Sequence, residues 1–257
     1  MSAKSWTHML PRKAFFESLC RSQYTGRAGP DFLASASASV VSPRRRVVAN
    51  SDTVRQTFAG DEALAGLSDE SILSLFTAGF FGGFVFGLEG LLSRAGAWRL
   101  LPVHFSTFQT VSGTTAPNNI WKSSDIPRLE LCSPGTTLFG IFQLIEKRIF
   151  DTRLSSSDAT TTTTSYVDYA FGSDQYSFAG CHRFSITRPF PPSPTTRVEP
   201  TQTQPTPPQQ IRTRISLEGF TCNPQREKQS MPAIGTWFHS RYAKALFANG
   251  IQAVLDR

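Results

Sequence analysis

His182 is the titratable residue whose position in the sequence best suits chemistry. Residues 176–187 alternate between apolar and small or polar side chains, and His182 falls on the apolar side together with Phe178 and Phe184. Histidine titrates near neutral pH, so one that faces an apolar pocket can act as a general base or contact a ligand. The alternative is a core histidine that is satisfied by one hydrogen bond. Both interpretations place His182 on a strand face that packs against protein.

We predict that a catalytic or ligand-binding site surrounds this histidine. Asp168 is a further polar candidate in the same region of the chain. The side chains expected to contact a ligand come from the neighbouring segments and from the C-terminal helix: Tyr169, Phe178, Arg183, Phe184 and Tyr242. Phe-rich faces with few polar groups among them favour an apolar pocket.

No pattern in the sequence indicates a cofactor or a metal. The phosphate-binding loops G-x-G-x-x-G and G-x-x-x-x-G-K-S/T are absent, as is the nucleophile elbow G-x-S-x-G. Cys181 and His182 are neighbours on an expected strand, so their side chains point to opposite faces and cannot ligate one ion together. We therefore expect no cofactor and no metal, and whether the chain is an enzyme stays open.

Positive charge is concentrated at the N-terminal end. The formal net charge is +7, and residues 1–50 hold 8 Lys and Arg against 2 acidic residues. The rest of the chain is close to neutral, which argues against a nucleic-acid-binding face. The 4 cysteines are widely spaced, and neither a glycosylation sequon nor an apolar signal segment is found. These features favour reduced thiols and a cytoplasmic location.

An apolar, glycine-rich segment has two interpretations. Ser68 and the two acids that follow it predict the start of a helix, and residues 72–88 carry no charge. Glycines recur at every fourth position from Gly79 to Gly87, which favours close helix packing. The segment is either a buried helix of the core or, over residues 72–92, a span that makes the protein membrane-associated, because a span needs about 20 apolar residues.

Strand patterns dominate the second half of the chain. Residues 136–145 are β-branched and aromatic, and they predict a buried strand with a bulge at Gly140. Strict alternation over residues 176–187 and again over residues 211–220 predicts two amphipathic strands. A hairpin that joins these two strands would place the intervening residues in one long loop.

Together these elements predict a single α+β domain at residues 61–257. A curled antiparallel sheet is expected to pack on a long C-terminal helix at residues 233–248, with the glycine-rich apolar helix at the N-terminal end of the domain. Low-complexity segments at residues 155–165 and 189–210 predict disordered inserts. Residues 1–60 lack apolar periodicity and predict an irregular basic segment.

Four segments, in this order, resemble an uncharacterised family of bacterial and plant proteins that is classed only as a domain of unknown function. They are VDYAFG at 167–172, GCHRF at 180–184, EGFTCNP at 218–224 and HSRYAKAL at 239–246. The resemblance implies a curled antiparallel sheet over a long helix, similar to the helix-grip folds that bind lipids and polyketides. Cys181 and His182 stand where that family has two acids. The Thr-, Pro- and Gln-rich insert is similar to those of filamentous-fungal proteins, which implies an accessory role in secondary-metabolite biosynthesis.

The expected function is therefore to bind or convert a hydrophobic small molecule. A lipid or a polyketide-like intermediate would lie between the sheet and the terminal helix. The alternative is a membrane-anchored accessory or interaction protein in which residues 72–92 cross the bilayer. Nucleic acid is not an expected partner, and the sequence leaves the oligomeric state open.

Overall fold

A computed structural model of the chain describes residues 10–44, 48–59, 64, 66–87, 103–111, 118–150, 162–189, 212–226 and 233–257. The strands are β1 (Gln23–Thr25), β2 (Val48–Ala59), β3 (Asn119–Ile120), β4 (Thr137–Leu138), β5 (Phe142–Arg148), β6 (Thr162–Gly172), β7 (Ala179–Pro189) and β8 (Arg212–Cys222). The helices are α2 (Lys13–Arg21), α3 (Pro30–Leu33), α4 (Ala36–Val41), α5 (Asp69–Gly82), α7 (Ser106–Val111) and α8 (Ala233–Leu255), with a short 3-10 turn at Ser123–Asp125.

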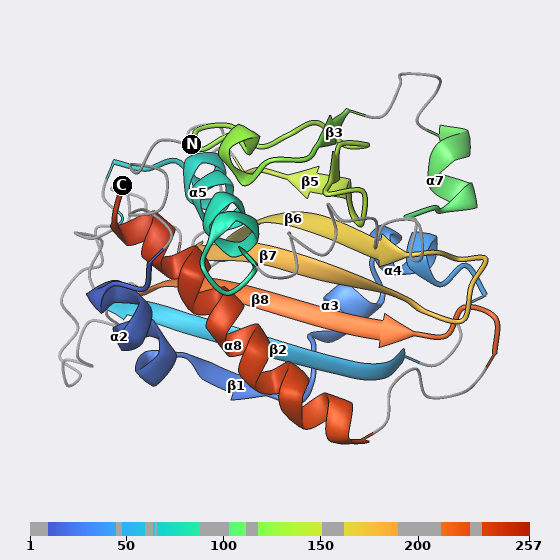
Figure 1. Cartoon of the computed structure of the whole chain (residues 1–257), viewed down its shortest axis with the longest axis horizontal. Helices are drawn as coiled ribbons and strands as arrows, with labels where there is room; N and C mark the ends of the chain where they lie inside the picture. Colours follow the sequence, from blue (N-terminus) through green and yellow to red (C-terminus); the bar gives the residue numbers. More distant parts are fainter. Residues whose placement is uncertain are drawn as a thin grey trace, which may run out of the picture.

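The strands form one curled sheet in the order β1-β2-β8-β7-β6-β5-β4-β3. Neighbouring strands are antiparallel except β3 and β4, which are parallel. Helices α5 and α8 cover one side, called the inner face, and α3 and α4 lie against the other side, called the outer face (Figure 1). The predicted α+β class, with a curled antiparallel sheet packed on a long C-terminal helix, is thus confirmed. So is the pairing of the two amphipathic strands, β7 and β8, as antiparallel neighbours.

The inner face is filled by aromatic side chains. Strand residues at every second position point to this face, as the period of a strand requires. Phe184 of β7 is fully buried, and its ring centroid lies 5.0 Å from that of Phe76 and 4.8 Å from that of Phe80, both on α5. Phe247 of α8 packs on Phe76 at 5.4 Å. The main hydrophobic core therefore lies between the sheet and these two helices.

Helices α5 and α8 approach each other closely because glycines face the contact. A Cβ atom added at Gly79 would lie 2.4 Å from Cβ of Ala253, and one at Gly250 would lie 2.5 Å from Cε2 of Phe76. The observed helix is shorter than the apolar run at residues 72–88 from which it was predicted, because α5 ends at Gly82. Gly83 is its C-cap and has an extended backbone conformation. Of the glycines that recur at every fourth position, only Gly79 therefore lies within α5, and Gly83 lies at its C-cap.

None of the helices in the described part of the chain combines the length and the apolar character that crossing a membrane requires. Residues 88–92 of the segment considered as a span lie outside the described residues.

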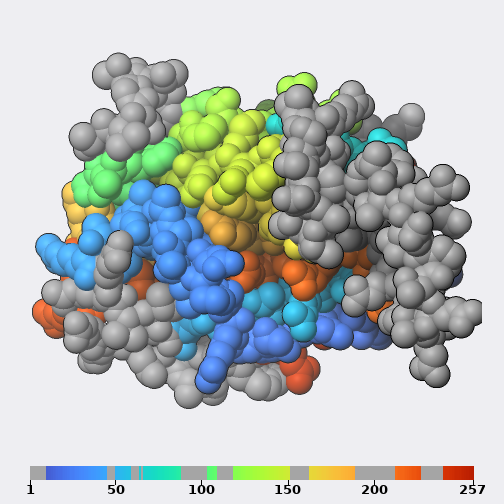
Figure 2. Space-filling model, turned by 180° about the vertical axis from the view of Figure 1, so that it is seen from behind, coloured from blue at the N-terminus to red at the C-terminus, as the bar shows by residue number. Residues whose placement is uncertain are grey.

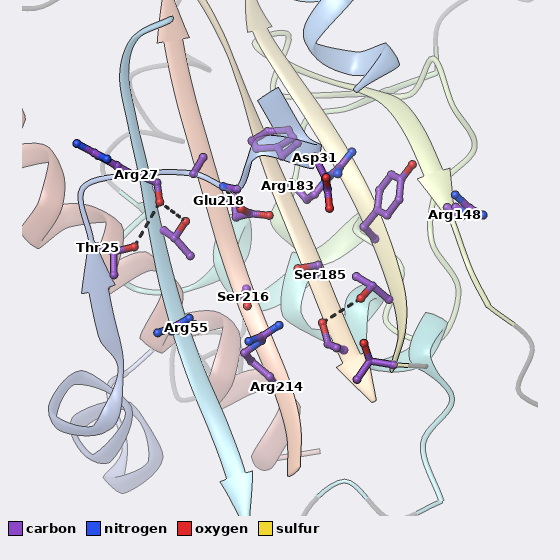
Figure 3. A pocket seen from close by; sticks show the side chains of 18 of the residues that line it. Thr25, Arg27, Asp31, Arg55, Arg148, Arg183, Ser185, Arg214, Ser216 and Glu218 are labelled. Atoms are coloured by element: carbon purple, nitrogen blue, oxygen red, sulfur yellow. Dashed lines mark hydrogen bonds between the residues drawn. The ribbon is translucent and has the colours of Figure 1, made fainter. Parts of the chain in front are cut away.

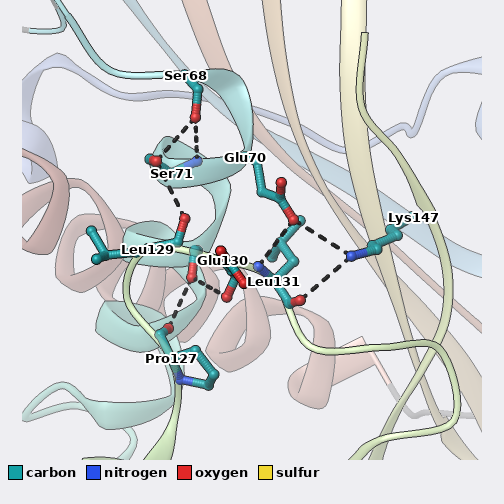
Figure 4. A network of polar contacts seen from close by, with 9 residues as sticks. Ser68, Glu70, Ser71, Pro127, Leu129, Glu130, Leu131 and Lys147 are labelled. Atoms are coloured by element: carbon teal, nitrogen blue, oxygen red, sulfur yellow. Dashed lines mark hydrogen bonds and ion pairs between the residues drawn. The ribbon is translucent and has the colours of Figure 1, made fainter. Parts of the chain in front are cut away.

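Polar contacts fix the first turn of α5 to its surroundings (Figure 4). The Ser68 hydroxyl accepts a hydrogen bond from the Ser71 N–H at 3.1 Å, which confirms the predicted helix start. The Glu70 carboxylate accepts from Lys147 of β5 at 3.5 Å and from a backbone N–H of the segment 127–131 at 3.3 Å. The helix is thereby held against the β5 side of the sheet.

The N-terminal 60 residues differ from the predicted irregular segment. They contain α2, β1, α3, α4 and the long strand β2, which pairs with β8 from Val48 to Ala59. Strand β2 belongs to the same sheet as β6, β7 and β8, so a domain boundary at residue 60 is wrong. Its inner-facing positions include Asp52 and Gln56, and these polar residues break the apolar alternation that would have indicated a strand.

Two further elements differ in extent from the predictions. Residues 136–145 form two short strands and not one, because the chain turns between β4 and β5 at Phe139 (φ 55°) and Gly140 (φ 72°). Helix α8 does not end before Asn249 and Gly250 but continues to Leu255. Gly250 lies inside the helix, where the absence of a side chain leaves room for Phe76 of α5.

The predicted inserts fall mostly outside the described residues. Strand β6 begins at Thr162, so the last four residues of the insert predicted at 155–165 are strand. The remainder of that insert and residues 190–210 are not described.

Candidate functional site

An open groove with a volume of about 580 Å³ lies on the outer face of the sheet. Strands β2, β8, β7 and β6 form its floor, and the loop before α3 and the end of β5 form its sides (Figure 3). From behind, the N-terminal residues, in blue, lie over part of this face, and the strands reach the surface beside them (Figure 2).

The strand register arranges the outer-face side chains in three rows across the sheet. The first row, next to α3, holds Thr53, Glu218, Arg183 and Asp168. The second row holds Arg55, Ser216, Ser185, Tyr166 and Arg148. The third row holds Thr57, Arg214, Thr187 and Thr164.

Two serines lie side by side in the middle of the second row. Ser185 and Ser216 are direct partners on β7 and β8, and only 5% and 7% of their surface is exposed. Both line the groove, and neither hydroxyl makes a hydrogen bond within the described part of the chain. A buried hydroxyl that faces a cavity can donate to an acceptor on a ligand.

Two arginines, Arg55 and Arg214, lie beside this serine pair, and a third, Arg148, lies in the same row beyond Tyr166. Arg55 donates to Gln23 at 3.3 Å, and Arg148 stacks on the ring of Phe150 at 4.7 Å. Arg214 lies on β8, two residues from Ser216. Among the described residues, none of the three arginines has a carboxylate within ion-pair distance. The second and third rows therefore carry positive charge without a compensating acid.

Arg183, in the first row, is compensated inside the protein. Its Nε and Nη2 donate to the two carboxylate oxygens of Asp168 at 2.8 and 2.7 Å. The guanidinium also lies 3.8 Å from the ring centroid of Tyr166 and 4.7 Å from that of Phe32. Asp168 is fully buried, and this burial raises its pKa while Arg183 opposes the rise. Arg183 lines the groove, and the buried Asp168 carboxylate holds its guanidinium in place.

Tyr166 keeps its phenol proton at neutral pH. Its hydroxyl donates to Glu146 at 2.7 Å, and burial, together with this hydrogen bond, raises the pKa of Tyr166 above its usual value. The Glu146 carboxylate thus holds the phenol of Tyr166 in place on β6.

Two carboxylates mark the end of the groove that is next to α3. Glu218 accepts a hydrogen bond from the Gly29 N–H at 2.7 Å through one of its oxygens. Asp31 comes from α3 and lies at the same end as Glu218, whereas the Arg27 side chain points away from the floor (Figure 3). The Arg27 carbonyl accepts hydrogen bonds from Thr25 at 3.3 Å and from Thr53 at 2.9 Å, which hold the loop in place.

The residues predicted from the sequence do not share one site. His182 faces the inner side, where its ring centroid lies 4.9 Å from that of Phe171 and 6.0 Å from that of Phe80. Tyr169 is buried beside it on β6, and desolvation raises the pKa of this phenol. Arg183 points to the opposite face of the sheet, so the structure separates it from His182.

The other predicted contacts stay on the inner side. Phe184 is buried under α5, and Phe178 is half-buried with its ring 5.9 Å from that of Phe171. Tyr242 of α8 is half-buried against the same core. These side chains belong to the packed core between the sheet and the helices, together with Tyr169.

Apart from Arg183, the residues that line the groove were missed because they occupy the polar side of the strand pattern. The alternation that places Phe184 inside also places Ser185 outside, and a polar strand side is ordinarily exposed to water. The available signal was the pair of alternating arginines at positions 212 and 214. The two serines become neighbours only when β7 and β8 pair.

No protein-family model, curated protein or solved structure matches the chain. In the part of the chain that the structure describes, no three His, Cys, Asp or Glu side chains come together to hold a metal ion.

Proposed function

We propose that the protein binds an anionic small molecule in the outer-face groove. The carboxylate or phosphate of the ligand lies over Ser185 and Ser216, between Arg55 and Arg214. The observation that carries this proposal is the pair of buried hydroxyls that face the groove beside arginines without carboxylate partners. Guanidinium groups bind carboxylates and phosphates through short, charge-assisted hydrogen bonds, and serine hydroxyls add neutral donors.

The floor geometry supports recognition of one anionic group by several strands. Side chains on adjacent strands stand about 5 Å apart, so donors from β2, β8 and β7 converge on one position without any movement of the backbone. The serine hydroxyls are on short side chains and Arg55 is held by Gln23, so these donors lose little conformational entropy when the ligand arrives.

The hydrophobic ligand that the sequence predicted between the sheet and α8 stays a prediction. The described aromatic side chains there are buried against one another, as Phe76, Phe80 and Phe184 are. The outer groove is open and polar, so it is the better-supported place for a ligand.

Calorimetric titration with inorganic phosphate, and separately with acetate, tests the proposal at low ionic strength. Arg214→Gln is expected to weaken the binding of both anions about tenfold, which corresponds to about 1.4 kcal/mol. Arg128→Gln is the matched control, because it removes the same charge at an exposed position outside the groove. Equal affinities in the two variants, or no heat from either anion with the parent protein, would contradict the proposal.

A preference between the two probes identifies the chemistry of the anionic group. Tighter binding of phosphate indicates a phosphorylated ligand, and tighter binding of acetate indicates a carboxylate. Because the arginines are partly exposed, the affinity should fall as salt is added.

A further inference from the structure

The groove is polarised along β8. Arg214, Ser216 and Glu218 are two residues apart and point to the same face. At about 3.3 Å per residue, the positions of Arg214 and Glu218 are about 13 Å apart, with Ser216 midway. One strand therefore carries a cation, a hydroxyl and a carboxylate in series.

The carboxylate end is built and held by contacts. Glu218 is tied to Gly29 through one oxygen, and its second oxygen makes no hydrogen bond within the described residues. Asp31 adds a second negative charge at this end, and it has no ion pair in the described part of the chain. The nearby charge of Arg183 is compensated by Asp168. This end of the groove is therefore suited to a cation.

The opposite end has the reverse character. Arg214 lies in the third row, Arg55 lies in the second row beside Ser216, and no carboxylate is among the described residues of these two rows. A simple dianion would meet Glu218 and Asp31 with a like charge, which is unfavourable. A ligand with opposite charges at its two ends is complementary to the groove along its whole length.

We propose, on the basis of the anion site described above, that the natural ligand is an extended zwitterion. Its ammonium group lies between Glu218 and Asp31, and its anionic group lies over Ser185 and Ser216. The two charged ends are then about 7–13 Å apart, since Ser216 lies two strand residues from Glu218 and Arg214 lies four. A peptide of two to four residues with free termini has this length when it is extended, because an extended chain covers at most about 3.3–3.6 Å per residue.

Tetraglycine, N-acetyl-tetraglycine and glycine are the probes that test this inference by calorimetric titration. Acetylation removes the charge of the amine and adds a neutral acetyl group. The parent protein is expected to bind tetraglycine about two- to fivefold more tightly than the acetylated peptide, which is the range of a partly exposed ion pair. Glycine is expected to gain nothing from its amine relative to acetate, because it is too short to reach Glu218.

Two variants separate this inference from the proposed function. Glu218→Gln keeps an acceptor for Gly29, so it is expected to abolish the preference for the free amine and to leave the affinity for the acetylated peptide unchanged. Asp31→Asn should act in the same direction, and it provides a second measurement if Glu218→Gln lowers the melting temperature. Arg214→Gln should weaken both peptides together.

Each failure has a distinct signature. Equal binding of the two peptides to the parent, with both still dependent on Arg214, overturns the zwitterion and leaves the anion site intact. Binding that is the same in Arg214→Gln as in the parent overturns the proposed function and, with it, this inference.

Discussion

The inner and outer faces of the sheet are made by the same strands, yet they differ in what covers them. On the inner face, α5 and α8 bury side chains such as Phe184 and Phe247 completely. On the outer face, the short helices α3 and α4 bury a smaller apolar cluster that includes Phe32 and Phe220, and the remaining strand surface is the polar groove. Adjacent residues of one strand therefore face either the packed core or the open groove, and substitutions on the two faces should have different effects on stability.

The largest effect is expected from Phe184→Ala on the inner face. The Phe184 ring contacts those of Phe76, Phe80, Phe81 and Tyr169, with centroids 4.8–6.0 Å away. Its removal should lower the free energy of unfolding by about 3–5 kcal/mol, measured by urea denaturation.

Ser185→Ala is the control for this substitution, because it changes the next residue on the opposite face. It should alter the free energy of unfolding by no more than about 0.5 kcal/mol. Similar losses in the two variants would show that the two faces do not differ in their contribution to stability.

The next effect is expected at the contact between α5 and α8. Gly79→Ala would place a methyl group 2.4 Å from Cβ of Ala253 and 2.5 Å from the carbonyl oxygen of Asn249. The overpacking should cost about 1–3 kcal/mol, although alanine is the better helix former. Thermal melting gives the measurement, and Gly87→Ala is the control, since among the described residues no atom beyond its chain neighbours lies within 4 Å of its added Cβ. A Gly79→Ala protein as stable as the parent would refute the close packing.

A smaller effect should appear at alkaline pH from the apolar cluster of the outer face. Burial raises the pKa of the Cys222 thiol from 9.0 to about 11, and the nearby Ser42 hydroxyl opposes this rise. Between these values the unfolded chain loses the thiol proton and the folded protein keeps it. The stabilisation from this thiol is thus complete below pH 9 and is lost as the pH rises through 11.

The free energy of unfolding, measured from pH 8 to pH 12, tests this sign. Cys222→Ala should fall less steeply with pH than the parent, whereas Cys20→Ala, at an exposed thiol, should follow the parent. An alkaline slope that is unchanged in Cys222→Ala would contradict the burial of this thiol.

The smallest effect on stability is expected inside the groove. Arg214→Gln and Arg55→Gln should each change the free energy of unfolding by less than about 0.5 kcal/mol, because neither guanidinium has a carboxylate partner among the described residues. Urea denaturation measures this alongside the calorimetric titrations. A large loss of stability in either variant would show that this arginine contributes to the stability of the fold. The two faces of the sheet would then not differ in this respect at that position.

The sequence by itself determined the elements that depend on neighbouring residues. The cap at Ser68, the alternation in residues 176–187 and 211–220 and the long C-terminal helix each follow from contacts a few residues apart. These patterns were sufficient for the α+β class and for placing Phe184 on the apolar face of its strand, whereas its packing beneath α5 came from the structure. The same alternation predicts that Arg183 and His182 point to opposite faces of the sheet. The structure confirms this, so the two side chains do not share one site.

Only the tertiary structure decided which strands meet and what their polar sides form together. Strand β2 belongs to the sheet through its pairing with β8, although the polar residues Asp52 and Gln56 interrupt the apolar alternation that would indicate a strand. The second row of the groove draws residues from positions 55 to 216, and no local signal links them. The physical reason is that a side-chain period of two fixes the face on which a residue lies, whereas the register between distant strands fixes its neighbours.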